Sequence, residues 1–138
     1  MNFTVPDKYK NLIAVKYAQK VATGQIIAGK YIILECIRFI NDLNRIEDED
    51  FEWYFDLKTY EFIIDFSKLF KFADGINAGK PMTLAEFQEW ILANLFCWKH
   101  KEDKYVRFSR AYIQVSRKQG GNFAPSYRNI CRIIEQYR

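Results

Sequence analysis

Residues 31–43 have the sequence YIILECIRFINDL, and this stretch decides the fold class predicted for the chain. Its apolar side chains return every three or four positions, which is the spacing of one face of an α-helix. The members of this stripe are Ile32, Ile33, Cys36, Ile37, Phe39, Ile40 and Leu43. The stretch therefore predicts an amphipathic helix with a broad buried face.

Helical patterns continue on both sides of this stretch. Residues 7–22 also place apolar side chains at helical spacing, and Gly24 follows as a residue suited to a left-handed helix end. After the stretch, the dense acidic residues 47–50 favour an exposed loop. Asp56 is then placed to cap a helix over residues 57–72.

A further helix is predicted before the single histidine. Thr83 and Glu86 have the spacing of a capping box, which predicts a helix that begins there and ends near Trp98. His100 and its charged neighbours are expected to form a solvent-exposed turn. The aromatic residues of the chain are expected mainly in its core, including Phe62, Phe66 and Phe70, which recur at helical spacing.

Extended structure is expected in two places. Residues 51–55 suit a short strand, and the apolar content of residues 106–115 predicts a strand whose second half is buried. Two glycines end that strand, and a last helix is predicted within residues 122–138. The predicted fold class is mainly α: a helical N-terminal unit with one or two short β-strands near the C-terminal third.

The composition is that of one folded domain. Of 138 residues, 49% are hydrophobic and 17% are aromatic, which suffices for a core. No apolar stretch approaches the roughly 18–20 residues of a membrane helix, and the first residues lack a signal-peptide pattern, so we expect a cytoplasmic protein. Three separated cysteines and one histidine disfavour a disulfide framework, a structural zinc site and histidine-dependent triads; buried thiols are expected.

The charge is unevenly distributed along the chain. The net charge is +4, and residues 99–138 contain ten Lys or Arg against three acidic residues. This basic segment suits a polyanion such as ATP or DNA, and a solvated basic surface explains it equally well. Both interpretations stay open at the level of sequence.

Four blocks of sequence follow one another in a familiar order. They are residues 17–31 (YAQKVATGQIIAGKY), 78–88 (AGKPMTLAEFQ), 94–98 (NLFCW) and 110–120 (RAYIQVSRKQG). Together they resemble the N-terminal part of the terminase large subunit of tailed bacteriophages, over roughly residues 8–120. Each block alone has little specificity, and the specificity comes from the four in order.

The resemblance implies a place in viral DNA packaging. Full-length members of that family are ATP- and magnesium-dependent motors with an additional nuclease, and they work with a small terminase and a portal ring. By this resemblance, residues 1–105 correspond to the helical N-terminal region. Residues 106–121 correspond to a strand and a degenerate phosphate loop, and residues 122–138 form a divergent C-terminal helix. The expected partners are a small terminase, a portal or a host factor.

The same resemblance assigns vestigial nucleotide-binding positions. Gln88 matches the family's adenine-contacting glutamine, and an amide that donates and accepts at once suits the adenine edge. Arg117 and Lys118 match the basic start of the phosphate loop, where cations approach phosphates. Gly120 matches the last glycine of that loop. An ordinary surface glutamine and a solvated basic turn are the alternatives at these positions.

The phosphate loop departs from the family pattern just after Gly120. The loop requires Lys followed by Ser or Thr, which hold the β- and γ-phosphates and the magnesium ion. Here Gly121 and Asn122 occupy those positions. We therefore expect a truncated, catalytically inactive terminase-like protein that is not an enzyme and carries no cofactor or metal of its own.

Two other hypotheses remain open. The first is a repurposed phage or prophage protein that modulates a small terminase, portal or host defence protein by binding it. The second is weak DNA binding through the basic residues 99–138. The edges of the predicted strand 106–115 also leave a homodimer open.

Overall fold

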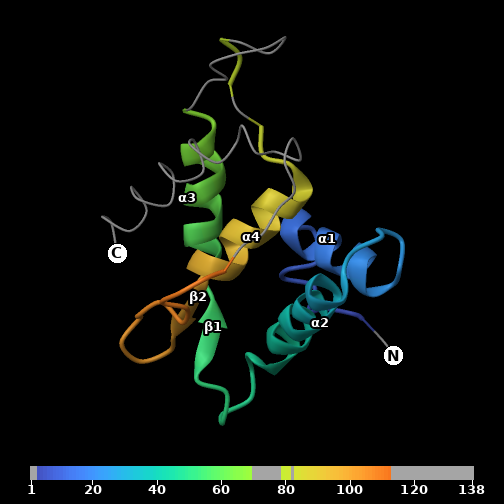
Figure 1. The fold of residues 1–138 in the computed structure, drawn as a ribbon. Helices are drawn as coiled ribbons and strands as arrows, with labels where there is room; N and C mark the ends of the chain where they lie inside the picture. The colour runs from blue at the N-terminus through green and yellow to red at the C-terminus, as the bar shows by residue number, and fades with distance from the viewer. Residues whose placement is uncertain (1–2, 70–78, 82, 113–138) are drawn as a thin grey trace.

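The computed structural model describes residues 3–69, 79–81 and 83–112, and within them the chain is mainly helical, as its sequence predicts (Figure 1). The elements in chain order are α1 (Ile13–Ala22), α2 (Lys30–Arg45), β1 (Trp53–Phe55), α3 (Leu57–Ser67), α4 (Glu86–Phe96) and β2 (Trp98–His100). In these ranges α1 packs against both α2 and α4, and α3 packs against α4. The predicted C-terminal helix lies outside the described residues.

The central helix α2 follows its predicted stripe. Cys36, Phe39, Ile40 and Leu43 are buried, whereas Ile32, at one edge of the stripe, is 39% exposed. Ile37 was predicted in the same stripe, but it is only half-buried and lines a surface depression on the other side of the helix. The first helix is shorter than predicted, because residues 7–11 form turns and α1 begins only at Ile13. α1 ends as expected, with Gly24 at a φ of +83°, a conformation that costs glycine little.

The helix α3 begins where the sequence predicts it. Asp56 is its N-cap, and its Oδ1 accepts hydrogen bonds from the backbone N–H groups of Lys58 and Thr59 at 3.0 and 3.4 Å. The described part of the predicted range is helical to Ser67. The expectation that Phe62 belongs to the core is wrong, because Phe62 is 45% exposed on α3 and stacks on Phe66.

The start of α4 corrects the predicted capping box. Thr83 is not the cap; the helix begins at Glu86 after Ala85, whose backbone N–H donates to the Gln88 side chain at 2.8 Å. Ala85 and Gln88 therefore occupy the two capping positions that the sequence pattern assigned to Thr83 and Glu86. The helix also ends earlier than predicted, at Phe96, which leaves Trp98 to begin β2.

The sheet is small and antiparallel. β1 pairs with β2 with Trp53 opposite His100 and Phe55 opposite Trp98, which confirms the short strand expected in residues 51–55. The prediction of a strand over residues 106–115 is wrong for the residues that the structure describes, 106–112. Of these only Val106 forms a bridge, to Lys99, and residues 110–112 are exposed. His100 is likewise no exposed turn residue, since its side chain is 22% exposed and meets the Trp53 ring at 5.3 Å.

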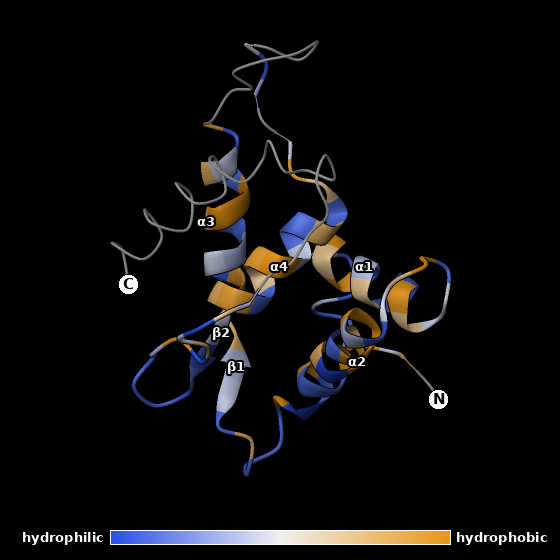
Figure 2. Cartoon of the chain, viewed as in Figure 1, coloured by the Kyte–Doolittle hydropathy of each residue, from blue (hydrophilic) through white to orange (hydrophobic). Residues whose placement is uncertain are grey.

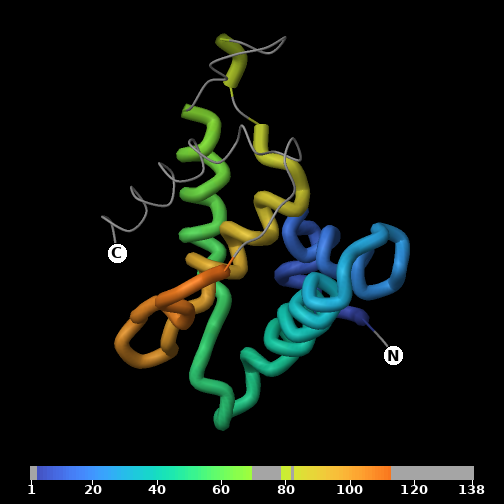
Figure 3. The backbone as a smooth tube through the Cα atoms, viewed as in Figure 1, coloured from blue at the N-terminus to red at the C-terminus, as the bar shows by residue number. Residues whose placement is uncertain are grey.

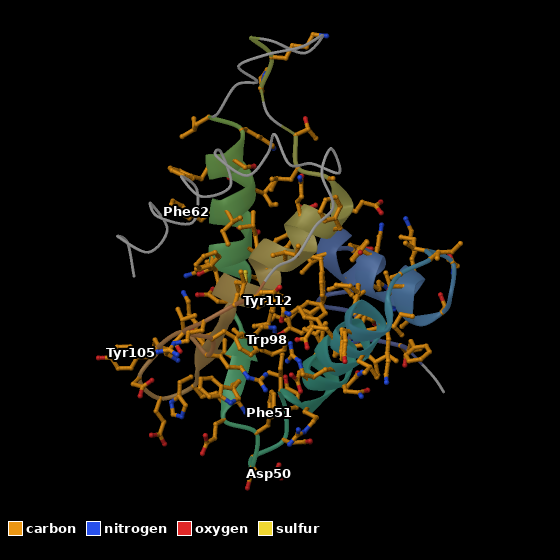
Figure 4. The ribbon with its side chains drawn as sticks, viewed as in Figure 1. Asp50, Phe51, Phe62, Trp98, Tyr105 and Tyr112 are labelled. Atoms are coloured by element: carbon orange, nitrogen blue, oxygen red, sulfur yellow. The ribbon has the colours of Figure 1, made fainter. Side chains whose placement is uncertain are left out.

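The core lies where α1, α2, α4 and the two strands meet. Trp98 (labelled in Figure 4) and Phe39 are its largest fully buried side chains. Their ring centroids are 5.8 Å apart in an edge-to-face arrangement. Phe55 completes this aromatic cluster against both rings. As expected, Cys36 and Cys97 are buried thiols, and burial raises the pKa of Cys36 to about 12.

Two loops extend away from this core. The backbone trace shows residues 46–52 turning below α2 and residues 101–105 forming a separate loop beyond β2 (Figure 3). Residues 47–50 are all exposed, which confirms the loop predicted from their charge. Within the part of the chain that the structure describes, no cluster of three or more acidic, His or Cys side chains is placed to hold a metal ion. Every helix described is too short or too polar to span a bilayer.

Candidate functional site

Gln88 is the one predicted nucleotide-binding residue that the structure describes. Its side chain is buried, at 7% exposure, and its Oε1 accepts the hydrogen bond from Ala85 at the start of α4. The local sequence explains this, because Ala85 has no side chain able to cap the helix and Gln88 lies three residues later. Contact of Gln88 with adenine stays a prediction. Arg117, Lys118 and Gly120 lie outside the described residues.

A polar cluster around Asp42 is the most densely connected group of charges described. Asp42 is 4% exposed, and its Oδ2 accepts from Arg38 Nη1 at 2.5 Å and from Arg107 Nη1 at 2.8 Å. Arg38 lies one helical turn before Asp42, whereas Arg107 follows β2. Two guanidinium groups therefore hold one buried carboxylate, in the arrangement that offsets the cost of burying charge.

The same cluster extends to α4. Arg38 also donates to Glu35 and, at 3.0 Å, to the Oδ1 of Asn94, while the Asn94 Nδ2 donates to Glu35 at 3.3 Å. Burial acts to raise the pKa of Glu35, but these hydrogen bonds and the Arg38 charge outweigh it, so the pKa lies below its usual value. The cluster thus joins α2, α4 and the segment after β2.

Aromatic rings surround the guanidinium of Arg107. Its carbon lies 5.1 to 5.8 Å from the centroids of four rings, those of Phe51, Trp53, Trp98 and Phe108. A cation over the face of such rings is stabilised by the ring quadrupole. Arg107 is therefore fixed by ring contacts as well as by Asp42. Two of these rings, Phe51 and Trp98, are labelled in Figure 4.

Two further polar contacts join distant elements. Lys99 on β2 donates to Asp56 Oδ2 at 2.8 Å and to Thr59 Oγ1 at 2.6 Å, which ties the sheet to the start of α3. Tyr60 on α3 donates to Glu89 on α4 at 3.0 Å and accepts from the Ala14 backbone N–H of α1 at 3.3 Å. Each contact bonds a polar group that would be costly to bury alone.

These contacts account for most of the basic side chains in residues 99–112. Lys99 and Arg107 are bound as described, Lys101 donates to the carbonyls of Ile46 and Asp48, and Lys104 lies 4.7 Å above the Tyr54 ring. Their positive charges therefore serve the fold itself. The basic segment 99–138 suggested DNA contact in the sequence, but residues 99–112, which carry five of its ten basic side chains, use most of these in contacts within the chain.

A different surface, on α2, carries exposed apolar side chains. Tyr31 is 81% and Leu34 is 52% exposed, and Ile27 just before the helix is 99% exposed. Figure 2 colours part of the link between α1 and α2 as hydrophobic. An open, shallow depression of about 640 Å³ on the same helix is lined by residues that include Leu34, Ile37, Asn41 and Arg45. A cluster of apolar residues open to solvent is typical of an interaction site.

Only part of these sites could be predicted from the sequence. Glu35, Arg38 and Asp42 are spaced three and four residues apart, which predicts neighbours on one helix. Nothing local indicates that Arg107 completes the cluster, since it lies 65 positions away from Asp42. The exposure of Tyr31 and Leu34 could not be predicted, because residues 31–34 form a continuous apolar run in which periodicity does not separate exposed from buried side chains.

Comparisons with protein-family models, with curated proteins and with solved structures returned no match to this chain.

Proposed function

We propose that this chain is a large-terminase-like protein related to viral DNA packaging, which acts by binding a protein partner and does not hydrolyse ATP. The proposal is supported by the four ordered sequence blocks within residues 17–120. The single observation that carries the absence of hydrolysis is the pair Gly121 and Asn122, at positions where the phosphate loop needs Lys and then Ser or Thr.

The physical reason lies in the charge of the substrate. A nucleotide triphosphate is held by the loop lysine, and its magnesium ion by the adjacent hydroxyl. Glycine at 121 offers only a backbone N–H, and asparagine at 122 presents a neutral amide. Neither side chain neutralises the charge that develops during phosphoryl transfer.

The surroundings of Gln88 support the same conclusion. An amide recognises adenine by donating and accepting at the same time. The Oε1 of Gln88 already accepts the Ala85 N–H, and the side chain is buried at the start of α4. Its geometry suits a helix cap, and this role requires no nucleotide.

A second candidate is a repurposed interaction protein that modulates a packaging or host component. The exposed Ile27, Tyr31 and Leu34 favour it, because such residues on a folded domain are typical of a binding surface. The two candidates share the binding activity and differ in the partner.

Phosphate release with Mg-ATP, together with isothermal titration, tests the first part of the proposal. We expect no turnover above a buffer control. Turnover that is abolished by Lys118→Ala would show a working phosphate loop and overturn it.

Binding to a purified small terminase and portal tests the second part. These are taken from a phage whose large terminase carries the same four blocks. Saturable binding to either supports a role in packaging. Binding to neither contradicts that role and leaves the second candidate as the better account.

A further inference from the structure

The single histidine of the chain is the last residue of β2, and the loop of residues 101–105 follows it directly (Figure 3). Backbone hydrogen bonds close the base of this loop. The His100 N–H donates to the Tyr105 carbonyl at 2.8 Å, and the Lys104 N–H donates to the His100 carbonyl at 3.0 Å. The imidazole is 22% exposed and meets the Trp53 ring, so its place beside the loop is fixed by packing.

One ring nitrogen of His100 faces a donor and an acceptor at equal distances. The backbone N–H of Glu102 donates to Nδ1 at 3.3 Å, and the Oδ1 of Asp103 also lies 3.3 Å from Nδ1. A nitrogen that accepts a hydrogen bond carries no proton, so the neutral imidazole with this contact has its proton on Nε2. In that state the Asp103 carboxylate, which only accepts, forms no hydrogen bond with Nδ1.

A second proton on the imidazole reverses the two contacts. Nδ1 then becomes a donor, and the Glu102 N–H that points at it loses its acceptor. The new Nδ1–H is within reach of Asp103 Oδ1, and a hydrogen bond from an imidazolium to a carboxylate is charge-assisted. The two hydrogen bonds therefore exclude each other, and the protonation state of one nitrogen selects between them.

The other charged groups around the ring leave this choice to Nδ1. Glu52, just before β1, places its Oε2 3.9 Å from Nε2, which is too long for a hydrogen bond, and its side chain is 70% exposed. The side chain of Glu102 is also exposed. The neighbouring cations are engaged in contacts of their own: Lys101 with backbone carbonyls, Lys104 with an aromatic ring, and Arg107 with Asp42.

The loop has a shape that this choice is able to change. Lys104 has a φ of +64°, a region that residues other than glycine rarely occupy, so the backbone alone does not favour the present turn. Tyr105 (labelled in Figure 4) is 73% exposed, and its backbone N–H donates to the same Asp103 Oδ1 at 3.2 Å. A change at Asp103 therefore reaches an aromatic residue at the surface.

We infer that His100 is a pH-sensitive switch for the loop of residues 101–105. The neutral ring accepts from the Glu102 N–H, whereas the protonated ring donates to Asp103 and releases the Glu102 N–H to solvent. An imidazole gains its proton between about pH 5 and 8, a range in which few other side chains change charge. The switch requires no nucleotide and no partner protein, so it goes beyond the function proposed above.

Nitrogen-15 NMR of the imidazole tests the neutral state on the unaltered chain. Because the chain has one histidine, its two ring nitrogens give one pair of signals. We expect the neutral ring to carry its proton on Nε2 and to leave Nδ1 as an acceptor. A neutral ring with its proton on Nδ1 would overturn the inference, since that ring would donate to Asp103 before any change of pH.

The backbone amide signals of Glu102 and Tyr105 test the switch itself, followed from about pH 8.5 to 5. We expect both signals to change together with those of the imidazole, and the protection of the Glu102 N–H against exchange with solvent to fall. His100→Gln should abolish both changes, because glutamine does not titrate. Amide signals that do not follow the ring, or that change in the same way in His100→Gln, would rule out the switch.

Two variants of the loop separate the two halves of the switch. Asp103→Asn removes the charged acceptor, so protonation should still release the Glu102 N–H, but the change at Tyr105 should shrink. Glu102→Gln is the matched control, since it removes an exposed charge and keeps the backbone N–H that meets Nδ1; it should respond as the parent does. Circular dichroism checks that each variant is folded. Equal responses of Tyr105 in the two variants would contradict the assignment of Asp103 as the second partner.

Discussion

Arg107 donates to Asp42 across 2.8 Å, although the two residues are 65 positions apart in the chain. This bond attaches the segment after β2 to the middle of α2. The carboxylate is buried and is shared with Arg38, so removing it leaves two guanidinium groups facing each other. The stability of the fold is therefore expected to depend strongly on this one acidic side chain.

Asp42→Asn keeps the size of the side chain and removes its charge. We expect the free energy of unfolding to fall by about 3 kcal/mol, the lower end of the range for breaking a buried ion pair, because both arginines retain some exposure. Urea unfolding followed by tryptophan fluorescence measures this. Asp65→Asn, at an exposed pair on α3, is the matched control and should change stability little. A loss no larger than that of the control would contradict a stabilising role for the cluster.

The buried carboxyl of Glu89 is expected to make the fold less stable as pH rises. Burial raises its pKa above 4.5, and the hydrogen bond from Tyr60 opposes this only in part. A raised pKa in the fold means that its contribution to stability is complete below the unfolded pKa and is lost as pH rises through the folded pKa. Glu89→Gln, which still accepts from Tyr60, should therefore be more stable than the parent at neutral pH.

The measurement for Glu89 is the difference in unfolding free energy between parent and variant from pH 4.5 to 7.5. The advantage of Glu89→Gln should grow with pH and then level off. Glu61→Gln, an exposed change on α3, should give a flat difference. A difference for Glu89→Gln that shrinks as pH rises would reverse the assigned sign.

Asp56 combines a helix cap with an ion pair, and two substitutions separate them. Asp56→Asn keeps an acceptor for the N–H groups of α3 and removes the charge that Lys99 meets. Asp56→Ala removes both, so it should cost about 1 kcal/mol more than the asparagine variant, the usual value of an N-cap. Equal losses in thermal or urea unfolding would mean that capping contributes nothing here.

The acid limb of the stability curve offers a second test of Asp56. Burial acts to raise its pKa, but the hydrogen bonds from Lys99 and Thr59 and the Lys99 charge lower it below 3.8. A lowered pKa contributes stability above the unfolded value, and this is lost as pH falls through the folded pKa. Asp56→Asn should therefore lose less stability than the parent on acidification below about pH 4. A steeper loss in the variant would contradict the direction assigned to this pKa.

Phe39 tests the aromatic core. Its ring meets Phe55, Trp90 and Trp98 edge to face and is fully buried. Phe39→Ala should destabilise the fold by about 3–5 kcal/mol, the usual cost of such a cavity. Phe62→Ala is the control, since nearly half of that side chain is exposed. Similar losses in the two variants would place the centre of the core elsewhere.

The helical class of the fold could be predicted because it depends on local spacing. The stripe of α2 and the Asp56 cap both lie within a few residues, where periodicity and hydrogen-bonding geometry are decisive. Helix starts were less accurate: Thr83 has the sequence of a cap, yet Gln88 bonds Ala85 and the helix begins at Glu86. Two competing capping arrangements two residues apart, Thr83 with Glu86 and Ala85 with Gln88, cannot be separated by composition.

The candidate sites depended on contacts that local patterns do not contain. The apolar content of residues 106–115 predicts a strand, but in the described part only Val106 forms a bridge, and Arg107 packs against the rings of Phe51 and Trp53. His100 looked exposed among charged neighbours, yet strand pairing places it against Trp53. In each case a tertiary partner more than 40 positions away overrides the local preference.

The residues of the cluster around Asp42 are far apart in the chain, so they are synthesised at different times. Asp42 is added to the chain 65 residues before Arg107, and at about 5–20 residues per second the interval between the two is roughly 3–13 s. Until Arg107 is made, Arg38 is the one guanidinium of this cluster that the chain contains. The polar cluster that joins α2, α4 and the segment after β2 is therefore complete only once the chain has been made as far as Arg107.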